Sequence, residues 1–119
     1  MKKTVVIGAS PKEARYSNLA VRRLKNHGHE VVAVGLREGE IDGIPVHKDK
    51  PPVGDVDTVT LYLNADHQKL YYDYILSLHP RRIIFNPGAE NDELASMAES
   101  KGIKTMEACT LVMLATGQY

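Results

Sequence analysis

Short apolar runs alternate with amphipathic segments along the whole chain. A continuous apolar run of about four to eight residues is typical of a strand buried on both faces of a parallel sheet. One run, at 44–47, is isolated in a stretch from 35 to 55 that is rich in glycine, proline and charge, and it predicts a short strand inside a long connection. Together the runs predict a mostly parallel sheet with strands at 4–7, 30–34, 44–47, 56–63, 82–85 and 103–106.

The segments between these runs carry apolar residues at helical spacing. Ser17 is expected to cap a first helix that ends near Gly28, where a helix C-terminus favours glycine. A second helix is expected to begin at Asp66 and to stop before Pro80. The inward face of this second helix is predicted from four apolar residues: Leu70, Tyr74, Ile75 and Leu78.

Two further helical segments, at 91–101 and 111–115, complete an alternation of strands and helices. This alternation indicates an α/β fold with a three-layer, doubly wound, mostly parallel sheet of Rossmann-like type. A chain of 119 residues suffices for one core, so a single domain is expected to span 1–119. In such folds the ligand crevice lies beyond the carboxyl ends of the strands. The loops expected to border it begin at Gly8, Gly35, Asn64 and Asn86.

The turn after the first strand is the strongest indication of function. Gly8 ends the strand, and Ala9 and Ser10 lead toward a helix. Amide groups in the first turn of a helix have no acceptor within it, and their aligned dipoles favour an anion. Lys12 and Arg15 add positive charge beside this turn. The turn therefore predicts a binding site for a small ligand that carries phosphate.

Composition narrows the classes of partner. Fifteen basic and fifteen acidic residues cancel, and no block of like charge could hold a nucleic-acid backbone, so nucleic acid is not expected to bind. No apolar run is long enough to cross a bilayer, so no membrane association is expected. The start of the chain lacks a secretory signal, and a single cysteine fits a reducing cytoplasm. The histidines lack metal-ligand spacing, so no metal site is expected; a protein partner or homo-oligomer stays open.

The class of nucleotide follows from the residues at two strand ends. A Gly-x-Gly-x-x-Gly fingerprint with an acid after the second strand would indicate NAD, but only Gly8 of that fingerprint is present. The second strand is followed instead by Gly35, Leu36 and Arg37, and an arginine there suits a phosphate on the adenosine ribose. Both NADP and coenzyme A carry such a phosphate. No Gly-Lys-Ser or Gly-Lys-Thr triplet occurs, which excludes a Walker-type phosphate loop.

Several separated segments of the chain resemble a known family. In order and spacing they are similar to the small CoA-binding domain proteins, whose Rossmann-like fold is similar to the first domain of the succinyl-CoA synthetase alpha subunit. The resemblance covers nearly the whole chain. The segments that carry it are Val6 to Ser10, Ser17 with Asn18, Gly28 to Val31, Gly43, Pro87 to Asn91, and Gly102 with Ile103 leading to Cys109.

The resemblance implies that coenzyme A or an acyl-CoA is the cofactor. Its pyrophosphate would lie on the turn 8–10 with Ser17 nearby, its 3′-phosphate near Arg37, and its adenine beside the loop 63–64. The loop after the strand at 82–85 would reach the far side of the crevice. The expected cofactor-binding residues are thus Gly8, Ala9, Ser10, Lys12, Arg15, Ser17, Arg37, Leu63, Asn64, Asn86, Pro87 and Gly88.

Each of these residues also has a purely structural interpretation. The segments 8–10 and 86–88 fit tight turns, and the basic residues fit solvated surface charge. Cys109 would be reactive if a cation or helix N-terminus lowered its pKa, whereas an inert, buried thiol is the more common state of a lone cysteine.

Three functional hypotheses follow. No nucleophile with a base in reach and no paired carboxylates stand on the crevice loops, so no catalytic residue is expected. The resembled synthetase carries its phosphorylated histidine beyond the CoA domain, so acyl-CoA ligation by this chain alone is not expected. The first hypothesis is a non-catalytic carrier, sensor or accessory subunit that binds coenzyme A or an acyl-CoA. An NADP-binding oxidoreductase or redox sensor is the alternative, and an interaction module without a nucleotide is the third.

Overall fold

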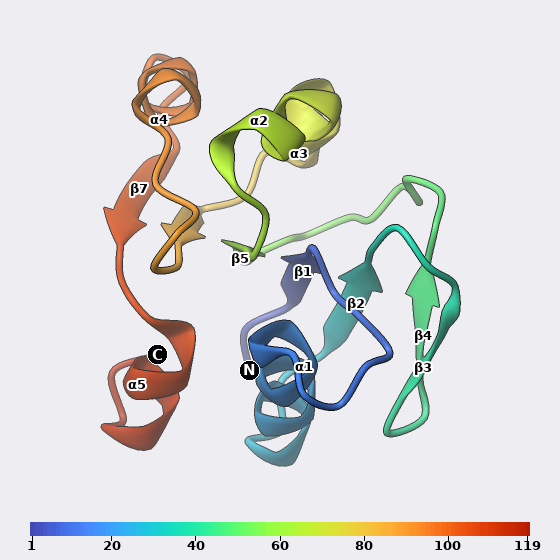
Figure 1. Ribbon diagram of the computed structural model, residues 1–119. Helices are drawn as coiled ribbons and strands as arrows, with labels where there is room; N and C mark the ends of the chain where they lie inside the picture. The colour runs from blue at the N-terminus through green and yellow to red at the C-terminus, as the bar shows by residue number, and fades with distance from the viewer.

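A computed structural model describes all 119 residues and contains one seven-stranded sheet with helices on both faces (Figure 1). The strands are β1 (Thr4–Ile7), β2 (Val31–Val34), β3 (Gly39–Ile41), β4 (Ile44–His47), β5 (Thr58–Leu61), β6 (Arg82–Phe85) and β7 (Lys104–Glu107). The helices are α1 (Tyr16–Asn26), α2 (Ala65–Gln68), the 3-10 turn η1 (Lys69–Tyr71), α3 (Tyr72–Leu78), α4 (Asp92–Glu99) and α5 (Thr110–Ala115). None of these helices combines the length and the apolar character needed to cross a membrane.

The strand order is β3-β4-β2-β1-β5-β6-β7, and every neighbouring pair is parallel except β3 with β4. The chain winds outward from β1 to one edge and then returns to β5 to wind toward the other edge. The strand order therefore reverses between β1 and β5, which is the switch point where doubly wound folds bind ligands. The predicted three-layer, mostly parallel fold is confirmed.

The register brings several strand ends to one edge of the sheet. Ile7, the last residue of β1, lies opposite Val34 of β2 and Leu61 of β5. The residues that follow these three positions therefore emerge side by side. The first of them are Gly8, Gly35 and Tyr62.

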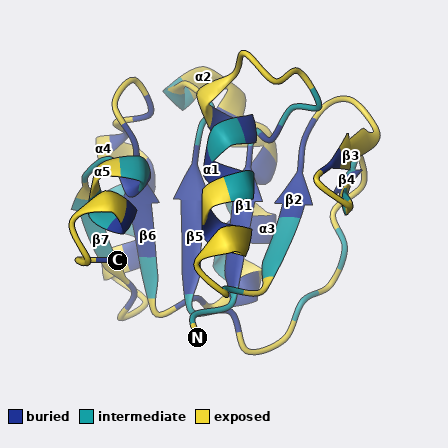
Figure 2. Cartoon of the chain, turned by 90° about the horizontal axis from the view of Figure 1, so that it is seen from below, coloured by how far each residue is buried: buried dark blue, intermediate teal, exposed yellow.

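Alternate residues of each strand feed two separate cores. Val5 and Ile7 pack on the face covered by α3 and α4, whereas Val6 packs on the face covered by α1 and α5. Figure 2 shows β1, β5 and most of β6 buried between these two helix layers. The sheet thus has both faces covered, as the continuous apolar runs predicted.

Two expectations about the first and second helices are wrong. Arg15, not Ser17, occupies the N-cap position of α1, without a side-chain cap, and Ser17 is buried in the first helical turn. The second helix begins one residue before Asp66, because the Asn64 side chain accepts a hydrogen bond from the backbone N–H of His67 and caps α2.

The inward face predicted for the second helix is wrong at Leu70, which is 66% exposed. The turn η1 interrupts the α-helical spacing between α2 and α3, and it is Tyr71 that points inward, at 5% exposed. Tyr74, Ile75 and Leu78 are buried as predicted.

The connection between β2 and β5 contains a strand that the apolar pattern does not predict. β3 pairs antiparallel with β4 through the two-residue turn Asp42-Gly43, where both residues have positive φ, 50° and 84°. The strand predicted at 56–63 is shorter, Thr58–Leu61, and the helix predicted at 91–101 ends at Glu99.

Candidate functional site

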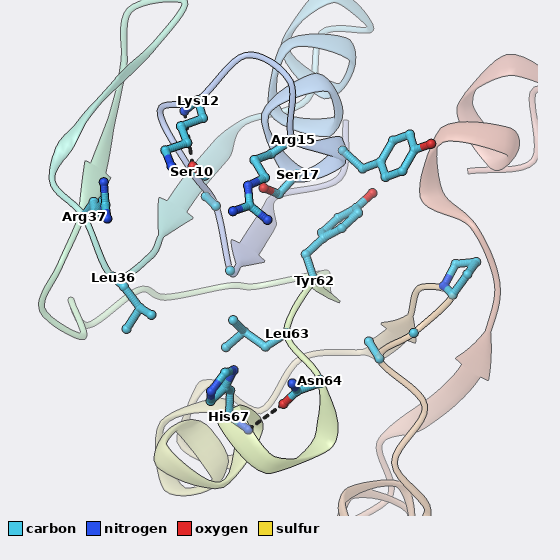
Figure 3. Close-up of a pocket in the computed structure, with 16 residues that line it drawn as sticks. Ser10, Lys12, Arg15, Ser17, Leu36, Arg37, Tyr62, Leu63, Asn64 and His67 are labelled. Atoms are coloured by element: carbon cyan, nitrogen blue, oxygen red, sulfur yellow. Dashed lines mark hydrogen bonds between the residues drawn. The ribbon is translucent and has the colours of Figure 1, made fainter.

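A cleft of about 530 Å³ opens over the carboxyl edge of the sheet, at the switch point between β1 and β5 (Figure 3). Its size falls within the range of small-molecule sites, about 300 to 1,000 Å³. The turn after β1, the start of α1 and the segment after β2 form one wall, and the loops after β5 and β6 with the start of α2 form the other. The lining residues are Gly8, Ala9, Ser10, Lys12, Arg15, Tyr16, Ser17, Leu36, Arg37, Tyr62, Leu63, Asn64, His67, Pro87, Gly88 and Ala89.

Gly8 shapes the turn after β1. Its φ is +93°, a left-handed conformation that favours glycine, and an added Cβ would lie 3.0 Å from both the Leu63 side chain and the Tyr62 backbone. The amides of Gly8 and Ala9 both donate to the carbonyl oxygen of Val34, at 2.9 and 3.0 Å. These two residues therefore set the course of the turn, and their N–H groups are already engaged within the protein.

The amides that remain free lie further along the same segment. The backbone N–H groups of Ser10, Tyr16 and Ser17 have no acceptor within the chain, and all three residues line the cleft. The Asn18 side chain holds this segment in place by donating to the Ser10 carbonyl at 2.9 Å. The start of α1 therefore offers unpaired donors to a ligand anion at a braced position.

The cleft carries an excess of positive charge. Lys12, Arg15 and Arg37 line it, and none of the three forms an ion pair within the chain. No carboxylate is among the lining residues. Three cations without local counter-ions, together with free amides, make the cleft complementary to a ligand with several negative charges.

Gly35 allows the first two strand ends to approach closely. A Cβ on this residue would lie 2.0 Å from the carbonyl oxygen of Ala9, closer than any two such atoms can come. Its own N–H donates to the His47 carbonyl at 2.9 Å and continues the β2–β4 pairing. The position of the turn against β2 therefore depends on a residue with no side chain.

A buried amide joins the loops of the far wall. The side chain of Gln68 is fully buried and donates to the carbonyl oxygens of Leu63 and Ala89, each at 2.7 Å. It also accepts from the Asn91 side chain at 2.9 Å, and Asn91 caps α4 by accepting from Leu94 N–H. Leu63 and Ala89 both line the cleft, so Gln68 ties the loop after β5 to the loop after β6.

The structure brings the expected cofactor-binding residues together with one exception. Asn86 does not line the cleft and is only 2% exposed. Its side-chain amide donates to the Thr60 hydroxyl and the Leu61 carbonyl, and it accepts from the Thr110 backbone N–H. Its neighbours in the turn do reach the cleft. Asn86 instead holds the carboxyl ends of β5 and β6 against the start of α5.

Five lining residues are absent from the sequence-based set. They follow the ends of β2, β5 and β6 or lie in the first turn of a helix, so the carboxyl-edge rule applied residue by residue would have found most of them. They are Tyr16, Leu36, Tyr62, His67 and Ala89.

Tyr62 borders the cleft with its ring while its hydroxyl is buried without a hydrogen-bond partner. Burial, with a smaller contribution from nearby Cys109, raises the pKa of this phenol well above its usual value, so it stays protonated. Cys109 itself is half-buried at the N-cap position of α5 and does not line the cleft. No cluster of three or more His, Cys, Asp or Glu side chains has the arrangement of a metal site.

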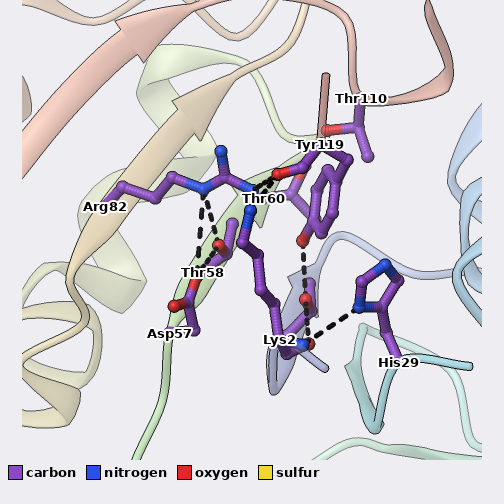
Figure 4. Close-up of polar contacts among 9 residues, drawn as sticks. Lys2, His29, Asp57, Thr58, Thr60, Arg82, Thr110 and Tyr119 are labelled. Carbon is purple, nitrogen blue, oxygen red and sulfur yellow. Dashed lines mark hydrogen bonds and ion pairs between the residues drawn. The ribbon is translucent and has the colours of Figure 1, made fainter. Parts of the chain in front are cut away.

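A second polar cluster lies at the opposite, amino edge of the sheet (Figure 4). We call it the Tyr119 cluster, and it comprises Lys2, Thr4, His29, Arg82 and Tyr119. The Tyr119 hydroxyl bonds the Thr4 hydroxyl at 2.6 Å, and Arg82 lies 4.5 Å from the ring centre while donating to the Tyr119 carbonyl. The His29 ring meets the Tyr119 ring edge-on and accepts from the Lys2 backbone N–H at 3.0 Å.

Comparison with known proteins identifies the family. The family described as "CoA binding domain" matches residues 2–115. The chain belongs to the CoA-binding domain family. A crystal structure of an uncharacterized protein shares 50% identity with this family member, with a TM-score of 0.97 and coverage of 100% of this chain and 98% of that one. No curated protein matches the chain significantly.

More distant structures share the fold of this CoA-binding domain protein. A hypothetical protein from Pyrococcus horikoshii OT3 is 22% identical, with a TM-score of 0.86, 97% of this chain covered and 82% of that one. The dinucleotide forming acetyl-coenzyme A synthetase 1 from Ca. Korarchaeum cryptofilum, in complex with phosphate and ADP, is 17% identical, with a TM-score of 0.71. The match covers 91% of this chain and 26% of that synthetase.

Proposed function

We propose that the cleft binds coenzyme A or an acyl-CoA, with the pyrophosphate at the start of α1 and the 3′-phosphate near Arg37. The observation that carries the proposal is the unpaired positive wall of the cleft. Lys12, Arg15 and Arg37 have no acidic partners, and the amides of Ser10 and Ser17 have no acceptors. Membership of the CoA-binding domain family favours coenzyme A over other phosphorylated nucleotides.

The end of β2 supports a ligand with a phosphate on its ribose. Gly35, Leu36 and Arg37 follow this strand, and no carboxylate lines the cleft to accept hydrogen bonds from free ribose hydroxyls. NAD is therefore disfavoured. NADP, which also carries a ribose phosphate, is the competing ligand.

We propose further that the protein acts by binding, as a carrier, a sensor or an accessory subunit in the cytoplasm. The cleft lining contains neither a thiol nor a carboxylate, and no hydrogen bond joins His67 to a hydroxyl that it could activate. Acetyl-CoA incubated with the protein should therefore remain intact. Release of free CoA thiol above the rate in buffer would contradict a role limited to binding.

Calorimetric titration of the full chain with CoA, 3′-dephospho-CoA, NADP and NAD tests the ligand. We expect CoA to bind most tightly, followed by dephospho-CoA, because dephospho-CoA keeps the pyrophosphate but lacks the ribose phosphate for Arg37. Tighter binding of NADP than of CoA would favour the oxidoreductase alternative. Heat from none of the four ligands would favour an interaction module that has no nucleotide.

A further inference from the structure

His67 faces the cationic wall from the other side of the cleft (Figure 3). It lies in the single turn of α2, where its backbone N–H donates to the Asn64 side chain at 3.0 Å. Its imidazole makes no hydrogen bond and no ion pair within the chain. The ring is exposed and lines the cleft, so both of its nitrogens are available to a ligand.

The charged side chains that line the cleft with this imidazole are all cations. The loop after β6 lines the cleft without a charged side chain, and the nearby Glu90 carboxylate accepts from Gly88 N–H at 2.9 Å. Lys12 and Arg15 project from the segment after β1, and Arg37 projects from the segment after β2. On its own helix the only carboxylate is that of Asp66, which lies 3.5 Å from the ammonium of Lys69. Protonation of His67 in the empty cleft therefore adds a fourth cation to three others. A bound anion reverses this balance, because it lies between the cations and the imidazole.

We propose that His67 is a fourth anion-binding group of the cleft and that it binds a phosphate of the ligand as an imidazolium, so that ligand binding takes up a proton. This inference rests on the proposed function and extends it to a residue on the opposite wall. A protonated imidazole has two N–H donors, whereas the neutral ring has one donor and one acceptor. The charged oxygens of a phosphate are acceptors, so the protonated ring with its two donors is the better partner.

The proposal has a direct consequence for the pH dependence of affinity. A contact that needs an imidazolium strengthens as the pH falls, because histidine is the side chain that gains its charge between about pH 8 and pH 5. We expect the affinity for CoA to rise about threefold to tenfold more from about pH 8 to pH 6 in the unaltered chain than in His67→Gln, in line with a solvent-exposed hydrogen bond to a charged group.

Proton uptake by the full chain is the sharper measurement. Calorimetric titration at pH 7 in two buffers with different ionisation heats gives the number of protons bound with the ligand. CoA and 3′-dephospho-CoA are titrated into the unaltered chain, into His67→Gln, and into the control His79→Asn. His79 is exposed at the end of α3, outside the cleft lining, and asparagine tolerates its positive φ of 46°. The 3′-phosphate itself titrates near neutral pH, so the difference between chains isolates His67.

The outcomes separate two questions. Greater proton uptake by the unaltered chain and His79→Asn than by His67→Gln supports the proposal. If this difference appears with both ligands, His67 contacts the pyrophosphate, and if it appears with CoA alone, His67 contacts the 3′-phosphate. Equal uptake and equal pH slopes in all three chains, or a loss of affinity in His67→Gln that does not vary with pH, would overturn it while leaving CoA binding intact. Failure of the unaltered chain to bind CoA would overturn the proposed function as well.

Discussion

Arg37 offers a test of how the ribose phosphate is recognised. Replacing it with alanine removes a cation without a partner in the protein, so the free energy of unfolding should hardly change. We expect Arg37→Ala to weaken CoA binding by about 1 to 3 kcal/mol and dephospho-CoA binding much less, as for a charge-assisted hydrogen bond. Calorimetry measures both. Arg23→Ala, in the last turn of α1 and outside the cleft, is the matched control. Equal losses with the two ligands would remove Arg37 from this role.

Gly35 offers a test of the packing behind the turn. Alanine at this position places a Cβ 2.0 Å from the Ala9 carbonyl, so the turn after β1 must move away from β2. We expect Gly35→Ala to lower the free energy of unfolding by about 1 to 3 kcal/mol, as overpacking of a tight site does, and to weaken CoA binding. Urea denaturation and calorimetry provide the two measurements. Gly54→Ala, where an added Cβ meets no atom within 4 Å, should change neither.

Most of the candidate site could be predicted from the sequence because one physical rule locates it. Residues that follow parallel strands meet at the same edge, and this rule led to the turn at Gly8 and to Arg37. The rule could not show that Asn86 has a structural role while Pro87 and Gly88 line the cleft. A side chain that binds a ligand and one that braces the fold can occupy the same position after a strand. What decides between them is burial and three hydrogen bonds to distant segments. His67 was missed because its place in the cleft depends on where α2 begins.

At the level of elements, the far wall of the cleft depends on α2. Gln68→Met keeps the approximate length of this buried side chain but leaves the carbonyls of Leu63 and Ala89 without their donor. We expect a loss of about 2 to 4 kcal/mol in the free energy of unfolding, because an unsatisfied buried acceptor costs about 1 to 3 kcal/mol and the partly buried Leu63 carbonyl costs less than that of Ala89. Chemical denaturation measures this loss. The control is Gln118→Met, since Gln118 is exposed and its side chain makes no hydrogen bond. A loss no larger than that of the control would contradict a bracing role for Gln68.

The elements differ in how far local sequence determines them. The predicted bounds of the buried strands β1 and β6 match the observed ones. Each strand consists of a continuous run of apolar or β-branched residues, preceded in β6 by Arg82. The helix after β5 was predicted as one regular segment, yet η1 divides it, since packing of Tyr71 against the core overrides regular α-helical spacing. β3 has only three residues, but the Asp42-Gly43 turn is a strong hairpin signal that the apolar pattern alone overlooked.

At the level of the whole molecule, the Tyr119 cluster links segments that are far apart in the chain, and it predicts a pH dependence of stability. Burial, together with nearby positive charge that includes the N-terminal amine, lowers the pKa of His29 below its usual 6.5. Between the lowered value and 6.5 the unfolded chain binds more protons than the folded one, so stability falls as the pH drops through this window. Protonation at Nδ1 would also remove the acceptor for the Lys2 N–H.

We therefore expect the unaltered chain to lose more stability than His29→Gln as the pH falls from 6.5 to 5, because glutamine offers an acceptor that does not titrate. Urea denaturation at several pH values measures the slope. His79→Asn is the control and should follow the unaltered chain, since this exposed histidine makes no side-chain hydrogen bond. Parallel slopes for all three chains would show that His29 does not carry the dependence.

One strand, β1, connects the two polar regions of the molecule. Thr4, the first residue of β1, forms a hydrogen bond with Tyr119. Gly8, which follows the last residue of β1, lines the cleft. With a rise of about 3.3 Å per residue, the two regions lie roughly 13 Å apart, beyond the range at which substitutions usually influence one another. A saturating ligand should then protect His29→Gln against unfolding by the same increment as the parent chain. Sequence changes at the amino edge can accordingly alter the resistance of this protein to unfolding without altering the selectivity of the cleft at the other end of the sheet.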